Sequence, residues 1–491
     1  MTQTRDGPWR GPDLAAGRGG RLDWSLPAVA LLTAVAFALR FRGIGEGLWR
    51  DEPVTLAETH GRTLRGVLDV VANGVEYNPP LPFVLSWLSA KAGDPTMWIR
   101  VPSLVLGTAT VPLVFLLGIR CLTRAAALVA AGFIALSPFA IHYGIEARAY
   151  GALMCFSVLS ALMLLVALET GRARWWVAYG GAVAAVLYTH YTGIFVIGAQ
   201  GAWALLVHRD RWRALLLTYL GVAVAYLPWL PNVHGDPSNL ELWGSLSGWG
   251  KWDAFLQWAA GSPELPPADL PGVAALVLIG CGVAVGLIGI ATSPGRRPPS
   301  TLIVLLALVT PVAILLYGHN LFLFPRNLSA SLPFAALLVG WALTPPRRVA
   351  MVTAVGLAGF GMGWGAAKTL EDRFHRPNAP SAARLVDEQA RAGDLVVHSG
   401  SGAEAFVLDQ IMRIHYSRNQ QVVVDPELSP ADFKTGADRG RVFLVQMTSS
   451  ELVVPPGFPL WERVEQRTYA GFVPLRLTVY QRRSSSRPPP G

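Results

Sequence analysis

The sequence predicts an α-helical, polytopic membrane protein with a small α/β domain at its C-terminal end. Of the 491 residues, 52% are hydrophobic and only 15% are charged, and the mean hydropathy is +0.39. Soluble globular proteins carry about 25% charged residues. A charge at the centre of a bilayer costs at least ~2.5 kcal/mol, so a membrane protein has few of them. Long apolar runs fill the chain up to about residue 366, and a mixed composition follows.

The first apolar run covers residues 26–41 and follows a leader rich in Gly, Pro and Arg. A spanning helix needs about 20 apolar residues. Residues 36–38 resemble a signal-peptidase site, but the leader is too long and loose for a typical signal peptide, and more spans follow. We therefore expect a retained first helix behind a disordered cytoplasmic leader, residues 1–24.

Ten further apolar runs predict about eleven spans in all. These runs begin near Val101, Ala125, Tyr150, Trp175, Thr192, Ala214, Gly272, Thr301, Ser329 and Val349. Their short connections carry basic clusters, which mark the cytoplasmic side. With the N-terminus inside, the clusters that fall on the cytoplasmic side are the leader arginines, Arg120 with Arg124, Arg172 with Arg174, residues 209–213, Arg296 with Arg297, and Arg347 with Arg348. An odd number of spans then places the C-terminus outside.

The predicted domains follow from this tracing. Residues 25–366 form the transmembrane domain, whose first outer loop is about residues 43–100. Within that loop, residues 82–90 are apolar but too short to span, which indicates an interfacial or re-entrant helix. A second outer loop, residues 232–271, is rich in Trp, Pro and Gly.

Residues 367–480 are predicted to form the extracytoplasmic α/β domain, and residues 481–491 a disordered tail. Residues 381–392 read as an amphipathic helix that Gly393 ends. Four strand-like runs follow, at residues 395–397, 422–424, 442–445 and 475–480.

Composition and spacing also exclude several classes of protein. The net charge of +9 lies in short clusters between apolar runs, so it is a topology signal and not a nucleic-acid surface. The three cysteines, Cys121, Cys155 and Cys281, have no CxxC spacing and no nearby ligand pattern, so we expect neither a disulfide framework nor a zinc site. The chain has no Asp-x-Asp and no P-loop, so no metal or cofactor is predicted.

Asp51 and Glu52 follow the first helix on the predicted outer side. Two adjacent carboxylates at a membrane surface are costly unless they are solvated or used. One interpretation is a solvated loop or a cap for a following helix. The other is a catalytic site.

A second polar cluster favours the catalytic interpretation. His142, Tyr143, Glu146, Arg148 and Tyr150 crowd where one helix leaves the membrane and the next enters it. An interfacial belt would explain the tyrosines and Arg148, but it explains Glu146 poorly. Three more outer-side features carry the same kinds of side chain: Arg100 before a span, His190 with Tyr191 in a tight turn, and Arg326 after Pro325. Arginines at helix mouths suit phosphate, although each could merely anchor a helix end.

The order of these motifs resembles the GT-C glycosyltransferases, most closely the branch of the protein O-mannosyltransferases and lipid A aminoarabinose transferases. The resemblance covers residues 25–366. The motifs in order are Trp-Arg-Asp-Glu at 49–52, Asn-Pro-Pro-Leu at 78–81, Arg100-x-Pro-Ser, Glu146-x-Arg148-x-Tyr150, His190-Tyr191 and Pro325-Arg326. Asn78 stands where relatives commonly have His or Lys.

The resemblance implies a GT-C fold and transfer of one sugar from a polyprenyl-phosphate donor to an acceptor hydroxyl. It implies that Asp51 is the general base, that Glu52 orients the acceptor or Asp51, and that Arg148, Arg326 and Arg100 bind the donor phosphate. The pocket would be shaped by Asn78, His142, Tyr143, Glu146, Tyr150, His190 and Tyr191. Attack opposite the leaving phosphate implies inversion at the sugar carbon.

Two other functions stay open from the residues alone. A flippase or transporter of lipid-linked sugars would share the helices and basic outer sites, but it predicts charges near the bilayer midplane. A membrane scaffold or receptor would leave Asp51, Glu52 and the Glu146–Arg148 cluster without a role.

Overall fold

The computed structural model of the chain describes residues 24–73, 78–233, 248–262, 270–292, 300–317, 324–400, 404–424, 440–447 and 461–482. The predicted leader and tail lie almost entirely outside these residues, as does most of the second outer loop. The chain divides into two compact units. The first is Met1–Ile44 with Glu58–Lys368, and the second is Gly45–Ala57 with Thr369–Gly491.

The first unit is helical. Its long helices are α1 (Ser25–Arg42), α6 (Val101–Cys121), α7 (Arg124–Leu136), α9 (Tyr150–Thr170), α10 (Ala173–Leu187), α11 (Gly193–Val207), α12 (Trp212–Tyr226), α13 (Gly248–Ala260), α14 (Leu270–Ala291), α15 (Thr301–Tyr317), α16 (Leu332–Leu343) and α17 (Arg348–Lys368). Its shorter elements are η1 (Gly43–Gly45), α3 (Leu64–Asn73), α4 (Leu81–Ser89), η2 (Ala90–Ala92), α5 (Pro95–Trp98), α8 (Pro138–Tyr143), η3 (Arg209–Arg211), η4 (Leu230–Asn232) and η7 (Pro325–Ser331). Helix α2 (Glu52–Thr59) begins in the second unit and ends in the first, and η1 likewise crosses from Ile44 to Gly45.

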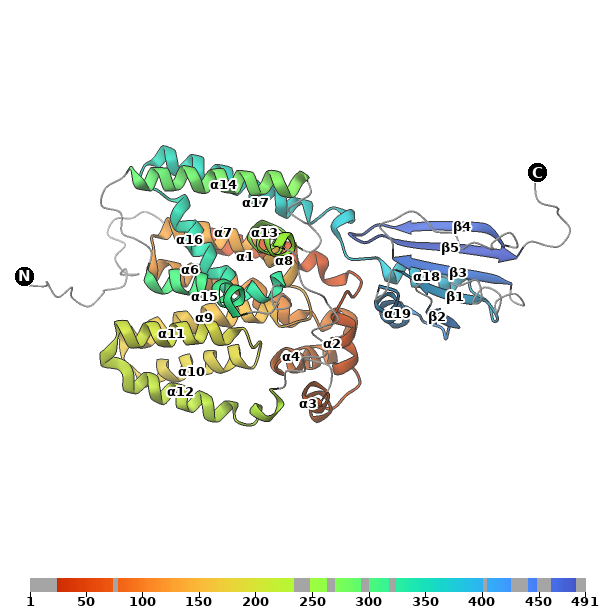
Figure 1. The fold of residues 1–491 in the computed structure, drawn as a ribbon, viewed down its shortest axis with the longest axis horizontal. Coiled ribbons are helices and arrows are strands. Elements are labelled where there is room, and N and C mark those ends of the chain that lie inside the picture. Colours follow the sequence, from red (N-terminus) through yellow and green to blue (C-terminus); the bar gives the residue numbers. More distant parts are fainter. Residues whose placement is uncertain are drawn as a thin grey trace, which may run out of the picture. The chain divides into compact units, whose positions relative to one another are not determined.

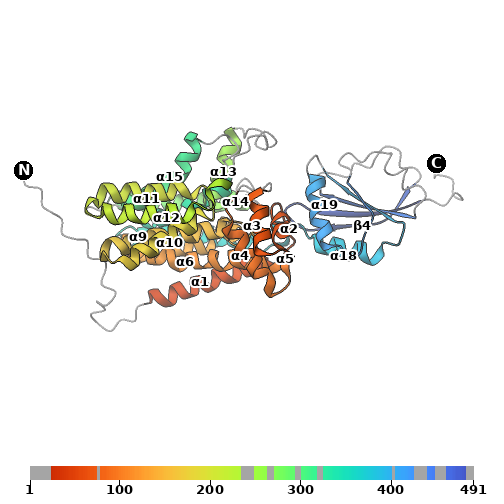
Figure 2. The same cartoon turned by 90° about the horizontal axis from the view of Figure 1, so that it is seen from below.

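The helices of the first unit pack on a shared apolar core. Helix α9 lies between α6 and α10, and α10 in turn packs against α12 (Figures 1 and 2). Buried residues of this core include Leu153 and Val158 of α9, together with Val186 of α10. Helix α9 ends at Gly171, whose φ of 66° is the left-handed conformation that glycine adopts without a side-chain clash.

Five helices among the described residues are long and apolar enough to cross a membrane: Ser25–Gly45, Pro95–Cys121, Tyr150–Thr170, Val273–Ala291 and Arg348–Lys368. Shorter apolar helices cover Arg124–Leu136, Gly193–Val207 and Thr301–Leu316. The chain is therefore a multi-pass membrane protein, as predicted. The total of about eleven spans and the inside position of the N-terminus stay predictions.

The second unit contains a five-stranded mixed sheet with the strand order β2-β1-β3-β5-β4. Its strands are β1 (Leu395–Ser399), β2 (Val422–Val424), β3 (Arg441–Met447), β4 (Trp461–Tyr469) and β5 (Leu475–Arg482). Strand β1 pairs in parallel with β2 and β3, whereas β5 runs antiparallel to β3 and β4. The prediction of a small C-terminal α/β domain is thus confirmed.

Two helices cover one face of this sheet (Figure 1). These are α18 (Ala379–Gln389) and α19 (Glu404–His415), and the short turn η8 (Asp372–Phe374) precedes them. Alternate residues of the strands, such as Phe443 and Val445, pack against the two helices in one apolar core. Their neighbours Val442 and Leu444 pack on the opposite face, which is the period-two pattern of a strand buried on both sides.

The predicted domain boundary at residues 366 and 367 stays a prediction. The compact units separate at Lys368 and Thr369, but they also assign Gly45–Ala57 to the unit that contains the sheet. The turn with Asp51 and Glu52 therefore folds with the C-terminal residues, although the sequence places it in the first outer loop.

Candidate active site

Tyr150 is the centre of an aromatic and basic cluster in the first unit. Its ring packs against Tyr143, with the centroids 5.1 Å apart, and against His190 at 5.8 Å. The guanidinium carbon of Arg326 lies 5.9 Å from the centroid of the Tyr150 ring. His142 extends the cluster, since its ring lies edge-on to Tyr143 at 4.7 Å. The fold thus gathers residues from the start of α9, the α10–α11 turn and η7.

Arg148 lies in the loop that connects α8 to α9. Its guanidinium carbon lies 5.4 Å from the centroid of the Phe83 ring, which belongs to α4. The hydroxyl of Ser103 in α6 donates a hydrogen bond to the Arg148 carbonyl oxygen at 3.2 Å. The residue is only 7% exposed. Contacts from two other helices therefore fix both the backbone and the charged end of Arg148.

The positive charges of Arg148 and Arg326 both influence His190. Burial and, to a smaller extent, the positive charges of Arg326 and Arg148 together lower the pKa of His190 from 6.5 to about 3. Its Nδ1 atom accepts the backbone N–H of Thr192 at 3.2 Å, so the neutral ring carries its proton on Nε2. Two guanidinium charges beside a neutral, buried imidazole favour an anion at this position.

The other predicted residues of the first unit have different surroundings. Glu146 is buried in the α8–α9 loop, where its backbone N–H donates to the His142 carbonyl oxygen at 3.3 Å. The Tyr191 hydroxyl accepts a hydrogen bond from the indole Nε1 of Trp229 at 3.4 Å. Asn78 is partly buried and precedes α4 by three residues.

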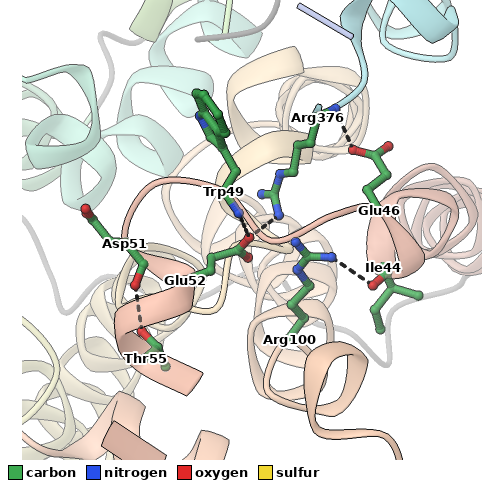
Figure 3. A network of polar contacts seen from close by, with 8 residues as sticks. All are labelled: Ile44, Glu46, Trp49, Asp51, Glu52, Thr55, Arg100 and Arg376. Carbon is green, nitrogen blue, oxygen red and sulfur yellow. Dashed lines mark hydrogen bonds and ion pairs between the residues drawn. The ribbon is translucent and has the colours of Figure 1, made fainter. Parts of the chain in front are cut away.

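Arg100 is completely buried at the start of α6. Its Nη1 atom donates a hydrogen bond to the Ile44 carbonyl oxygen at 3.0 Å (Figure 3). This contact ties α6 to the segment that follows α1. Its role in phosphate binding stays a prediction.

Asp51 and Glu52 form the start of α2 in the second unit. The backbone carbonyl of Asp51 accepts the N–H of Thr55 at 3.1 Å and the Thr55 hydroxyl at 3.3 Å, so Asp51 opens the first turn of the helix. Glu52 points to the other side of the segment, where its Oε2 atom accepts the backbone N–H of Trp49 at 3.1 Å and Nη1 of Arg376 at 2.6 Å (Figure 3). The Asp51 side chain points away from this ion pair (Figure 3).

The turn before Asp51 is strained. Arg50 has a φ of 50°, the left-handed conformation, which a residue with a side chain rarely adopts. Such a residue costs on the order of 1–3 kcal/mol and persists only where its surroundings enforce it. The hydrogen bond from the Glu52 N–H to the Trp49 carbonyl oxygen, 3.1 Å long, closes the turn around Arg50.

The predicted site residues therefore fall in two groups. His142, Tyr143, Glu146, Arg148, Tyr150, His190, Tyr191 and Arg326 belong to the first unit, as do Asn78 and Arg100. Asp51 and Glu52 belong to the second. Their roles in catalysis and binding stay predictions.

Several residues that support these groups were missed in the sequence. Arg376 contacts Glu52 from 324 positions away, so no local pattern could indicate the pair. Phe83 lies in the segment predicted to be interfacial, and its place under Arg148 depends on tertiary packing. Ser103 does lie in the Arg100-x-Pro-Ser motif, which was the available signal for its contact with Arg148.

The described part of the chain contains no group of three or more His, Cys, Asp or Glu side chains arranged to hold a metal ion. The three cysteines are free thiols, and burial differs among them, since Cys155 is buried and Cys281 is exposed. The basic cluster around Tyr150 instead offers guanidinium groups, which suit an anionic ligand.

Comparisons with known proteins bear on the fold and on the central part of the sequence. Residues 77–234 match the family of dolichyl-phosphate-mannose-protein mannosyltransferases. The chain is similar to ArnT from Cupriavidus metallidurans, solved bound to undecaprenyl phosphate, with 14% identity, a TM-score of 0.51, and coverage of 95% of this chain and 99% of that one. It is also similar to the oligosaccharyltransferase AglB from Archaeoglobus fulgidus, solved with an inhibitory peptide and a dolichol-phosphate, with 11% identity, a TM-score of 0.51, and coverage of 87% and 69%.

No curated relative matches the sequence. At these identities the structural likeness establishes the fold, and the family match adds a sequence relationship over the central residues 77–234. The chain is thus a multi-pass membrane protein that shares the fold of the glycosyltransferases ArnT and AglB, and its residues 77–234 resemble the protein mannosyltransferases.

Proposed function

We propose that this protein transfers a single sugar from a polyprenyl-phosphate donor to an acceptor hydroxyl on the outer face of the membrane. The observation that carries the proposal is that the charges of Arg148 and Arg326 both act on His190, while Arg326 also lies over the ring of Tyr150. Two arginines from segments far apart in the chain meet beside a neutral histidine, which is a charge arrangement suited to one phosphate group.

The chemistry assigns a step to each group of residues. Asp51 takes the proton from the acceptor hydroxyl, whose oxygen attacks the anomeric carbon of the sugar. The bond between that carbon and the phosphate oxygen breaks, and polyprenyl phosphate leaves with the electron pair. Arg148 and Arg326 stabilise the negative charge that develops on the phosphate, an effect often among the largest in catalysis. Attack opposite the leaving group inverts the sugar carbon.

Glu52 differs from Asp51 in its surroundings, and its role differs accordingly. Its carboxylate is completely buried and bonded to Arg376. A general base must reach the proton that it abstracts, so the half-buried Asp51 is the better base. Glu52 orients Asp51.

The lipids bound to two structural neighbours support the donor class. ArnT was solved with undecaprenyl phosphate and AglB with a dolichol-phosphate, which are both polyprenyl-type lipid phosphates. A lipid of this kind presents one phosphate at the membrane surface. The predicted topology places the N-terminus in the cytoplasm and the cluster around Tyr150 on the outer side.

The test uses the purified full chain in lipid nanodiscs with undecaprenyl phosphate carrying radiolabelled mannose, glucose or a pentose. Because the acceptor is unidentified, the reaction is followed as release of labelled sugar to water or to a membrane extract. We expect turnover of at least one donor. Binding without turnover for every donor would favour the flippase alternative, and absence of both binding and turnover would contradict the proposal.

A further inference from the structure

The segment that carries Asp51 is built into the core of the second unit. Trp49 is 7% exposed and belongs to the apolar core between the sheet and helices α18 and α19. Its ring packs edge-on against Phe472, with the centroids 5.0 Å apart. A Cβ atom at Gly47 would lie 2.6 Å from the Pro377 carbonyl oxygen, so the segment passes directly against residues 377–380. Trp49 and Gly47 therefore pack against residues of the C-terminal domain.

Arg376 joins both ends of this segment. Its backbone N–H donates to Oε2 of Glu46 at 3.1 Å, and its Nη1 donates to Oε2 of Glu52 at 2.6 Å (Figure 3). The side chains of Arg376 and Glu52 are 1% and 0% exposed. A buried carboxylate without its cation is strongly disfavoured, so the position of Glu52 depends on Arg376. Arg376 therefore holds the chain on both sides of the five positions 47–51.

The strained backbone at Arg50 lies between Glu46 and Glu52, the two residues that Arg376 contacts. A left-handed φ at a residue with a side chain needs external support. The turn has such support on both sides, from the packed ring of Trp49 and from the ion pair of Glu52 with Arg376. Release of the Glu52 side chain would allow the turn to relax, and Asp51 is the next residue after Arg50.

We propose that Arg376 is a positioning residue that holds the Asp51 turn in its reactive geometry through Glu52 and Glu46. This inference rests on the proposed function, because Arg376 can have a positioning role in catalysis only if Asp51 is the base. It assigns the C-terminal domain a part in catalysis, although the domain itself carries no residue of the basic cluster.

The experiment compares Arg376→Gln with Arg373→Gln in the full chain in nanodiscs. Arg373 is a matched control, since it lies three positions away and its ion pair with Glu371 is exposed. We expect Arg376→Gln to lower kcat about 10- to 100-fold, the loss that a misplacement of about 1 Å produces. The KM for the labelled donor and the affinity for undecaprenyl phosphate should stay unchanged. Hydrogen–deuterium exchange should rise in residues 46–55 but not in strands β1 and β3.

Each other outcome has a definite meaning. Turnover by Arg376→Gln within two-fold of Arg373→Gln would overturn the inference while Asp51 could still be the base. If Arg376→Gln exchanges throughout the sheet, Glu46→Ala replaces it, because that change removes the acceptor of the Arg376 backbone N–H and leaves the ion pair of Glu52 with Arg376 in place. An unchanged kcat in Glu46→Ala would then overturn the inference. If the wild type turns over no donor, the proposed function fails, and exchange in residues 46–55 alone decides whether Arg376 holds the turn.

Discussion

Glu52 and Arg376 form a buried ion pair, 2.6 Å long, between residues 324 positions apart in the chain. The pair connects the start of α2 with the segment that precedes α18. It explains why Gly45–Ala57 folds with the C-terminal residues and not with the helices that flank it in sequence. The predicted base Asp51 and the predicted phosphate-binding arginines thus come from separate compact units.

Loss of either Arg148 or Arg326 should weaken binding of the donor phosphate. A hydrogen bond to a charged group contributes about 1.5–3 kcal/mol. We therefore expect Arg148→Gln and Arg326→Gln to raise the Kd for undecaprenyl phosphate about 10- to 100-fold. Binding is measured with labelled lipid in nanodiscs. Arg120→Gln is the control, since Arg120 pairs with Glu169 at the predicted cytoplasmic ends of α6 and α9. Equal affinities in all three variants would refute the phosphate site.

His190 should make the protein less stable in acid. Its pKa is about 3 in the folded chain and about 6.5 in the unfolded chain, so between these values only the unfolded chain binds the proton. The free energy of unfolding therefore falls as the pH drops from 6.5 towards 3. At pH 5 the loss should be about 2 kcal/mol relative to neutral pH, and His190→Gln should abolish it.

The measurement of this effect is the unfolding of wild type, His190→Gln and His60→Gln in mixed micelles at pH 7.5 and pH 5.0. His60 is exposed and serves as the control. An identical pH dependence in wild type and His190→Gln would show that His190 is not held neutral by burial and the two arginines.

Gly144 should not tolerate a side chain. A Cβ atom there would lie 2.6 Å from Nε of the buried Arg40 and would also clash with the Ala140 carbonyl oxygen. Overpacking of this kind costs about 1–3 kcal/mol. Gly144→Ala should lower the thermal stability, and it should also lower turnover because Gly144 begins the loop with Glu146 and Arg148. Gly198→Ala is the control, since no atom lies within 4 Å of its Cβ position. Equal stability of the two variants would disprove the close packing.

The helical elements were largely predictable because each carries its own signal. The apolar runs beginning near Val101, Tyr150 and Thr301 correspond to α6, α9 and α15, whose first residues are the same. Runs of this kind reflect the length and composition that a bilayer requires. The predicted short helix at residues 82–90 likewise corresponds to α4.

Two elements of the C-terminal domain were missed for physical reasons. Strand β4 (Trp461–Tyr469) is largely exposed, and its charged residues hide the alternation by which a half-buried strand is recognised. Helix α19 (Glu404–His415) has a mixed composition between two strands, so its sequence carries no strong helical signal. The other four strands were predicted within a few residues because they are apolar.

The candidate site was predictable as a set of residues but not as an arrangement. Motifs such as Glu146-x-Arg148-x-Tyr150 could be recognised locally. The meeting of Arg326 with Tyr150, and of Glu52 with Arg376, depends on tertiary packing over long separations in sequence. Neither pair has a local pattern that indicates its partner.

The central claim is that Asp51 is the base of a transferase that uses a lipid-phosphate sugar. The most direct measurement compares donor turnover and undecaprenyl phosphate binding in wild type, Asp51→Asn and Asp69→Asn. Asp69 lies on α3 and is exposed, so its variant controls for the loss of a carboxylate. We predict that Asp51→Asn loses about 10²- to 10⁴-fold in turnover, as expected for a general base, while lipid binding persists and Asp69→Asn stays active. Undiminished turnover in Asp51→Asn would contradict the account.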